Sequence, residues 1–283
     1  MINRTALIRT IKNPSRIFPS LRKRWAPLVA LDPKDSKYTF SDLFVWRRGC
    51  SLETIYSCMP YVDLWNQHPL MIKNKPRNVR LVILSNTGQF IMESKYELEP
   101  YKKTNLNIAS QLQGDWDLVQ YGTFMLFYKD LPSRESLCGG YLADRGYVGY
   151  RVENGNTLNF VHGNLDAISC TYEGHGIENC TYTKSTVLMR RFCLQYLFDN
   201  NFDYDVAIVN PTNRLQSIAI DIRNRAHLNI GSLSLAVESL GARIFKIPRS
   251  KEPSLVTINS RVPMSRPLVF KSVGNKLVDV FHG

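Results

Sequence analysis

Residues 155–163 read GNTLNFVHG, and residues 274–283 read GNKLVDVFHG. Both segments begin with Gly-Asn, continue as a short apolar run and close on His-Gly, and their histidines, His162 and His282, lie 120 residues apart. A repeat of this kind indicates that one structural unit occurs twice in a chain. The two segments therefore predict two similar halves, each closing with a short strand.

The repeat extends upstream as a shared order of elements. In the first half, a strand pattern at 80–84 precedes turn residues at 86–88, and in the second half an alternating pattern at 217–222 precedes a polar turn at 223–225. Alternation with a period of two places one face of a strand in a core and the other in water. A chance likeness between two all-β halves is the alternative to a true duplication.

Length and composition are those of a globular protein with room for two cores. The chain has 283 residues, of which 44% are hydrophobic and 11% aromatic, so the disordered class is excluded. We expect an all-β protein with two tandem antiparallel β-sandwiches, immunoglobulin-like or jelly-roll-like, behind a basic N-terminal arm. The expected limits are residues 1–31 for the arm, 32–163 for the first sandwich and 164–283 for the second.

The positive charge is concentrated at the N-terminus. Residues 1–25 hold seven basic side chains and no acid, whereas the remainder holds 29 basic and 24 acidic side chains, or +5 of the net +12. A basic amphipathic segment binds nucleic acid, an anionic membrane surface or a protein partner, or it remains a solvated tail. The mildly basic remainder does not resemble a dedicated nucleic-acid-binding surface.

Other bulk features bound the compartment. No apolar run approaches the roughly 18 residues of a membrane-spanning helix, and the first 25 residues lack the apolar centre of a secretory signal. A cytoplasmic location is therefore the default expectation, and the compartment stays open. Six cysteines in so long a chain do not make a disulfide scaffold. Free, mostly buried thiols are favoured, with Cys170–Cys180 and Cys50–Cys58 as alternative pairs.

Residues 138–153 have the most unusual local composition, rich in glycine and tyrosine. Their spacing matches neither a dinucleotide-binding loop nor a Walker phosphate loop. Glycines let another group approach the backbone closely, and tyrosines offer flat amphipathic faces that stack on sugar rings or pack at interfaces. A bulged strand pair with half-buried tyrosines is the structural alternative. The candidate ligand-binding residues are Tyr141, Arg145, Tyr147, Tyr150 and Arg151.

Metal and catalytic signals are weak. His162, Asp166, Glu173 and His175 are candidate metal ligands, since imidazole and carboxylate groups suit zinc, manganese or iron. Their spacing matches no established metal motif. The recurrence of His-Gly in both halves favours a shared structural task, in which a ring nitrogen bonds to a turn. Nucleophile-elbow and metalloprotease motifs are missing from the sequence, so we assign no catalytic residue and no cofactor, and an enzyme is not favoured.

These observations leave three functional hypotheses, because a fold does not by itself determine a function. The leading one is a non-catalytic, oligomeric binding or assembly protein that recognises carbohydrate or a protein partner. The second is a jelly-roll capsid or shell-like structural protein whose arm binds nucleic acid. The third is a metal-dependent hydrolase built on the four candidate ligands.

Overall fold

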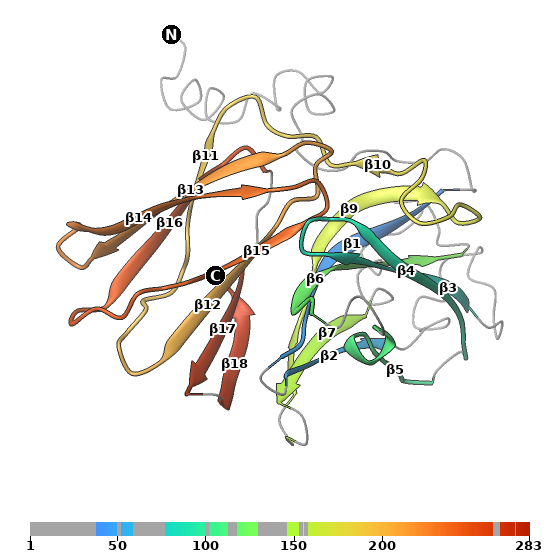
Figure 1. Ribbon diagram of the computed structural model, residues 1–283, viewed down its shortest axis with the longest axis horizontal. Helices are drawn as coiled ribbons and strands as arrows, with labels where there is room; N and C mark the ends of the chain where they lie inside the picture. The colour runs from blue at the N-terminus through green and yellow to red at the C-terminus, as the bar shows by residue number, and fades with distance from the viewer. Residues whose placement is uncertain are drawn as a thin grey trace, which may run out of the picture.

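The protein is described here by a computed structural model that covers residues 38–49, 52–58, 77–99, 102–112, 118–129, 146–152, 155, 158–262, 267–274 and 276–283. Within these ranges the secondary structure consists of β-strands and one short 3₁₀ helix, η2 (Ala109–Gln111) (Figure 1). The predicted all-β class with tandem sandwiches is therefore confirmed. The expected arm, residues 1–31, lies outside the described residues. The part of the chain that is described contains no helix with the length and hydrophobicity that crossing a membrane requires.

The first sandwich consists of two antiparallel sheets with the strand orders β10-β9-β1-β6-β3-β4 and β5-β2-β7-β8. Nearly every side chain of β6 is buried, as its continuous apolar sequence predicts for a central strand covered on both faces. The strands are β1 (Tyr38–Arg47), β2 (Leu52–Cys58), β3 (Arg77–Ser85), β4 (Phe90–Leu98), β5 (Thr104–Asn107), β6 (Tyr121–Tyr128), β7 (Tyr147–Val152), β8 (Asn159–Val161), β9 (Asn164–Thr171) and β10 (Thr181–Tyr182).

The second sandwich has the sheets β11-β16-β13-β14 and β15-β12-β17-β18. In β13, buried and exposed residues alternate, as the period-two pattern at 217–222 predicts. The strands are β11 (Arg190–Cys193), β12 (Asp203–Val209), β13 (Gln216–Asn224), β14 (Asn229–Val237), β15 (Ala242–Lys246), β16 (Ser254–Ser260), β17 (Leu268–Val273) and β18 (Lys276–His282).

The two halves share one strand order. Adding ten to the number of each strand from β1 to β8 gives its counterpart in the second half, while β9 and β10 extend the first sheet beyond β1. The order β4-β3-β6-β1 thus corresponds to β14-β13-β16-β11, and β5-β2-β7-β8 corresponds to β15-β12-β17-β18. The His-Gly segments fall at equivalent places, at the ends of β8 and β18. This shared topology supports the interpretation that the sequence repeat reflects a duplicated unit.

The stretch 164–186 has a Gly, Asn, Thr and Tyr content that is typical of a loop, but it contains two strands. Its first part forms β9, which pairs with β1, and β10 pairs with β9 in turn. The two strands extend the larger sheet of the first sandwich, so strand pairing groups them with that sandwich, while the division of the chain at residue 163 stays a prediction. The sequence of β9 gives no strand pattern, because Ala167, Ser169 and Cys170 are small buried residues without a strong apolar alternation.

The stretch 261–271 also differs from the edge strand or loop that its prolines predict. Residues from Leu268 onward belong to β17, which lies between β12 and β18 in the interior of its sheet. Pro267 stands immediately before this strand, where its missing N–H removes no bond from the ladder. Its carbonyl oxygen accepts a hydrogen bond of 3.0 Å from the amide of Gly283.

The sheet β15-β12-β17-β18 is apolar on both faces and joins the two halves. On one face, Val206 and Val269 belong to the core of the second sandwich. On the other, Ala207 and Phe270 belong to the apolar cluster of the first sandwich. In Figure 1 this sheet lies between the rest of the second sandwich and strands β2 and β7 of the first. The continuous apolar sequence of β12 follows from this double burial.

Polar contacts reinforce this junction. The Nη2 group of Arg47 in β1 donates to Oδ2 of Asp205 in β12 at 2.5 Å, and both side chains are about three-quarters buried. The hydroxyl of Thr123 in β6 donates to the carbonyl oxygen of Leu240. Each bond connects a strand of the first sandwich to the second half, so the two sandwiches dock in one defined arrangement.

Candidate functional site

Strand β7 separates the tyrosines that the sequence singles out. Tyr147 is 49% exposed, whereas Tyr150 is fully buried and its hydroxyl donates to the carbonyl oxygen of Val45 at 2.6 Å. Residues three apart on one strand point to opposite faces. Tyr150 therefore belongs to the core and cannot share a surface site with Tyr147. The other two candidates, Tyr141 and Arg145, lie outside the described residues.

The outer face of sheet β5-β2-β7-β8 carries a second exposed ring, Phe160, which is 43% exposed. Phe160 in β8 lies opposite Gly149 in β7, two residues from Tyr147. The two rings are thus diagonal neighbours on one face, where Cα atoms are about 7–8 Å apart. A Cβ at Gly149 would lie 2.9 Å from Cε1 of Phe160, so the ring lies across a glycine backbone. The ammonium of Lys103 lies 5.7 Å from the Phe160 ring centroid.

A row of hydrogen-bonding side chains adjoins these rings. Arg151, opposite Glu53 on the same outer face, donates through Nε to Oε2 of Glu53 at 2.6 Å. The other carboxylate oxygen of Glu53 accepts from the amide of Asn107 at 3.4 Å. The side chains of Arg151 and Glu53 are 38% and 22% exposed, so water or a ligand reaches both. We name Tyr147, Phe160, Arg151, Glu53 and Asn107 the aromatic face.

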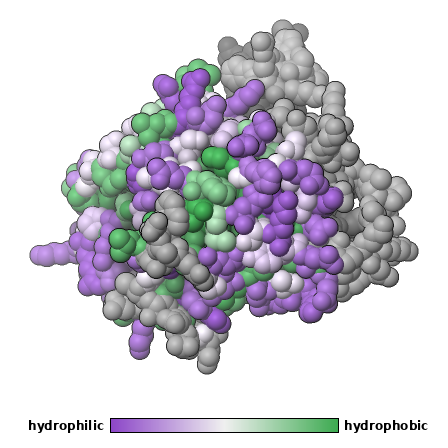
Figure 2. All heavy atoms as spheres, turned by 45° about the vertical axis from the view of Figure 1, so that its right-hand side comes forward, coloured by the Kyte–Doolittle hydropathy of each residue, from purple (hydrophilic) through white to green (hydrophobic). Residues whose placement is uncertain are grey.

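The surface around the described strands is mixed in character. Figure 2 shows apolar side chains in small groups among polar ones on the side turned toward the viewer. Exposed apolar residues scattered in this way are normal for globular proteins. What distinguishes the aromatic face is therefore the pairing of two rings with a hydrogen-bonded polar row, and not hydrophobicity alone.

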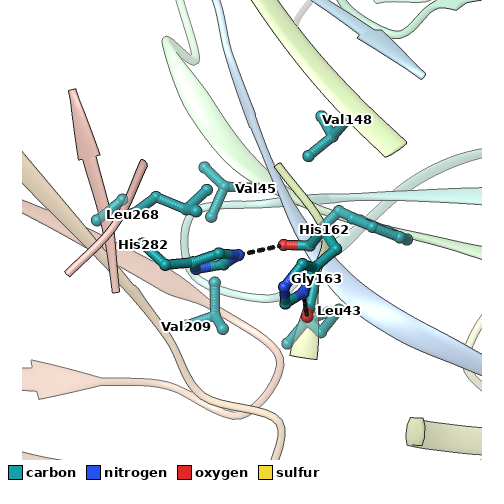
Figure 3. Close-up of a pocket in the computed structure, with 10 residues that line it drawn as sticks. Leu43, Val45, Val148, His162, Gly163, Val209, Leu268 and His282 are labelled. Atoms are coloured by element: carbon teal, nitrogen blue, oxygen red, sulfur yellow. Dashed lines mark hydrogen bonds between the residues drawn. The ribbon is translucent and has the colours of Figure 1, made fainter. Parts of the chain in front are cut away.

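The two His-Gly segments meet at the junction of the sandwiches. The ring centroids of His162 and His282 are 4.4 Å apart. Nε2 of His282 donates to the carbonyl oxygen of His162 at 2.8 Å, and Nδ1 of His162 donates to the carbonyl oxygen of Gly163 at 3.0 Å (Figure 3). Both rings thus bond to backbone at the end of a strand, the structural task that the repeat predicts.

The space beside these rings is too small for a substrate. The cavity measures about 10 Å³, the volume that a single water molecule needs. Most of its walls are apolar, formed by Leu43, Phe44, Val45, Val148, Ala207, Val209 and Leu268. The histidine pair is therefore a docking contact between the halves, with a ring from each side.

The four candidate metal ligands do not converge. His162 precedes β9 and His175 follows it, so this eight-residue strand separates them by roughly 26 Å at 3.3 Å per residue. Asp166 lies within β9, and Glu173 forms an ion pair of 3.4 Å with Lys129. Among the described residues, no three His, Cys, Asp or Glu side chains group closely enough to hold a metal ion.

An open groove of about 670 Å³ lies between β4 and the turn that joins β9 to β10. The sequence gives no signal for it, because its two walls are about 80 residues apart and meet only through tertiary contacts. The principal contact is the carboxylate of Glu93, which accepts the amide of Gly176 at 2.6 Å. The groove is lined by Phe90, Glu93, Ser94, Lys95, His175, Gly176, Ile177 and Glu178.

The fold defines a tandem antiparallel β-sandwich protein. No family model and no curated protein matches the sequence. Among solved structures, the chain has 7% identity and a TM-score of 0.15 to a β-glucuronidase from glycoside hydrolase family 2, covering 85% of this chain and 23% of that one. A β-glucuronidase from Ruminococcus gnavus gives 9% identity, coverages of 90% and 37%, and a TM-score of 0.17. An oxalate decarboxylase from Lactobacillus farciminis has 10% identity and a TM-score of 0.15, and the match covers 81% of this chain and 75% of that one.

The chain spans 23% and 37% of the two glucuronidases, well under half of either enzyme. TM-scores this low do not establish a shared overall fold or a shared activity. The sandwich architecture follows from the strands of this chain themselves, and the function is argued from its surface.

Proposed function

We propose that this protein is a non-catalytic binding protein that recognises carbohydrate through the aromatic face. The observation that carries the proposal is the pair of exposed rings, Tyr147 and Phe160, on adjoining strands of one sheet face. A pyranose ring has an apolar C–H face that packs on an aromatic ring, while its hydroxyls require hydrogen bonds. The aromatic face offers both kinds of contact side by side.

The polar row supplies complementary partners for sugar hydroxyls. Glu53 accepts hydrogen bonds, Arg151 donates them, and the amide of Asn107 does both. Their mutual bonds hold the groups in place before a ligand arrives, which lowers the entropy that binding costs. A sheet face is flat, so it suits successive sugar units of an oligosaccharide better than a small molecule, which needs an enclosing pocket.

The charge on this face favours binding over hydrolysis. Glycoside hydrolysis in most families needs two carboxyl groups about 5–9.5 Å apart. Of the described residues in β2, β5, β7 and β8, Glu53 alone carries a carboxylate, and it is engaged with Arg151. The shell-like alternative depends on the basic residues 1–25, which lie outside the described residues, and it stays a prediction.

A glycan-array screen of the full-length protein, followed by titration of the best ligand, tests the proposal. We expect Tyr147→Ala and Phe160→Ala each to weaken binding at least about tenfold, or about 1.4 kcal/mol. Phe90→Ala is the matched control, because Phe90 is as exposed as Phe160 (44% against 43%) but lies on β4 in the other sheet. Absence of any glycan ligand, or equal loss in all three variants, would overturn the proposal.

A further inference from the structure

Cys170 and Cys180 lie opposite each other, one residue beyond the last paired residues of β9 and β10. Thr181 lies opposite Ser169, so one further step along this antiparallel pair puts Cys180 opposite Cys170. Directly opposed residues have Cα atoms about 4.5–5.5 Å apart, within the range of about 4.4–6.8 Å that a disulfide spans. Both thiols are free in the structure.

A buried arginine adjoins the pair. Arg80 is fully buried, and its Nη2 group donates to Sγ of Cys170 at 2.7 Å. Its guanidinium carbon lies 5.0 Å from the Phe127 ring centroid, and its Nη1 group bonds to Glu93 at 3.3 Å. A buried cation is costly unless anions compensate it. Negative charge shared within the Cys170–Cys180 pair would provide such compensation, and a neighbouring arginine is a recognised means of activating a cysteine.

The two thiols differ in environment, which gives them different roles. A hydrogen bond from Cys170 and the charge of Arg80 lower the pKa of Cys180. The hydrogen bond with Cys180 and burial raise the pKa of Cys170. Cys180 is also partly exposed, whereas Cys170 is fully buried. Cys180 is therefore placed to react first with an oxidant, and Cys170 to react second.

We propose that Cys170 and Cys180 are a redox site at which a hydroperoxide forms a reversible disulfide. With hydrogen peroxide, the Cys180 thiolate attacks one oxygen, the O–O bond breaks, and the released hydroxide takes a proton from solvent to become water. Cys180 is then a sulfenic acid. The Cys170 sulfur attacks that sulfur, the S–O bond breaks, and the leaving hydroxide takes the thiol proton as a second water. Two sulfurs are oxidised and one peroxide is reduced.

The disulfide would act on the groove described above. Arg80 also donates to the carbonyl oxygen of Thr171, the last residue of β9, and to that of Gly176 in the groove wall, each at 3.2 Å. Disulfide formation joins the two ends of this turn and leaves no ionisable sulfur beside Arg80. Glu93, which also holds the amide of Gly176, then remains the carboxylate partner of Arg80. Oxidation of the two cysteines would therefore change the hydrogen bonds that Arg80 and Glu93 make to Gly176 in the groove wall.

The test treats the reduced full-length protein with hydrogen peroxide, alkylates the remaining thiols and maps the peptides by mass spectrometry. We expect one linked peptide pair, Cys170–Cys180, that disappears on reduction with dithiothreitol. Cys170→Ser should stop at the sulfenic acid of Cys180, which dimedone traps, and Cys180→Ser should give no adduct at Cys170. If either variant fails to fold, the peptide map of the wild-type protein still tests whether the Cys170–Cys180 disulfide forms.

Cys193 is an internal comparison, because it is an exposed free thiol in β11. Alkylation of Cys180 should reach half its maximal rate at a lower pH in the folded protein than in the urea-unfolded protein. Oxidation of Cys193 while Cys170 and Cys180 stay reduced would overturn the proposal, and so would linkage of either residue to another cysteine. Equal pH profiles for Cys180 in the folded and unfolded protein would overturn the activation of Cys180.

Discussion

At the scale of single residues, the position of a side chain along a strand decides its role. Tyr147 and Tyr150 lie three residues apart, so strand alternation alone assigns them to opposite faces. That separation was predictable from the sequence, and buried Val148 identifies the core face. The role of Phe160 was not predictable, because its place beside Tyr147 depends on the pairing of β7 with β8.

Two buried tyrosines link stability to alkaline pH. Burial raises the pKa of Tyr128 well above its usual value, and the neighbouring Tyr56 hydroxyl at 2.8 Å raises it further. Burial likewise raises the pKa of Tyr150, and the charge of Arg47 offsets this only in part. Each folded pKa exceeds the unfolded value of about 10. The stability that these tyrosines contribute is therefore complete below about pH 10 and is lost as pH rises through the folded pKa values.

We expect the urea midpoint of unfolding to fall steeply above about pH 10, where the unfolded chain loses its tyrosine protons. Tyr150→Phe removes one ionisable hydroxyl, so its midpoint should fall less steeply, although it should be lower at neutral pH because the bond to Val45 is lost. A midpoint independent of pH up to about 12 would contradict the link.

At the scale of elements, a glycine in β6 sets how closely β1 and β3 approach. Trp46 Nε1 in β1 donates to the carbonyl oxygen of Leu84 in β3 at 2.8 Å. A Cβ at Gly122 would lie 2.7 Å from that nitrogen and closer still to the Leu84 oxygen. The indole can reach across β6 to β3 only over a residue without a side chain.

Gly122→Ala should lower the free energy of unfolding by about 3 kcal/mol, the sum of overpacking and a lost buried hydrogen bond. Gly231→Ala in β14 is the matched control, since its Cβ would meet only ordinary contacts at 3.8 Å; it should change stability by less than about 1 kcal/mol. Chemical denaturation measures both variants. Similar stabilities for the two would show that the indole contact does not constrain β6.

Strands with a clear pattern were predictable, and strands without one were not. The apolar run at 80–84 and the alternation at 217–222 correspond to β3 and β13. β9 carries small residues that pack tightly between neighbours, so its burial leaves no apolar period. β17 begins directly after Pro267, and because a proline indicates an edge strand or a loop, the sequence does not predict an interior strand there.

At the scale of the whole molecule, the shared sheet β15-β12-β17-β18 should make the halves unfold together. Its two faces belong to different apolar clusters, so neither cluster can open without exposing this sheet. All four tryptophans precede the second sandwich in the sequence, and Trp46 is fully buried in the core of the first, so we use tryptophan fluorescence to follow the first half.

Ile220→Ala in the core of the second sandwich should cost about 2–5 kcal/mol and should lower the fluorescence midpoint together with the circular-dichroism midpoint. Ile220 is fully buried in β13 and belongs to the second cluster. Ser217→Ala, an exposed site on the same strand, is the control and should leave both midpoints unchanged. A fluorescence midpoint that does not respond to Ile220→Ala would show that the halves unfold independently.

The sequence predicts two similar halves, but it does not predict how they dock. The repeat places His162 and His282 at equivalent strand ends, and only the docked structure brings their rings to 4.4 Å. The same limit applies to the groove beside β4, whose walls come from distant segments. Contacts between the two sandwiches cannot be read from hydrophobic periodicity, because that periodicity reports only which face of each strand is buried and not what covers it.

The double burial of β12 has a consequence for its alignment. Residues 206–209 are apolar at four successive positions, so a slip by one residue would bury almost the same apolar surface. The polar residues that flank this apolar run, Asp205 and Asn210, must therefore distinguish the correct register of β12 from a shifted one. Asn210 donates to the carbonyl oxygens of Arg214 and Val237 within the second half, whereas Asp205 pairs with Arg47 of the first. The ion pair with the first half thus helps to fix the strand register of β12 in the second half.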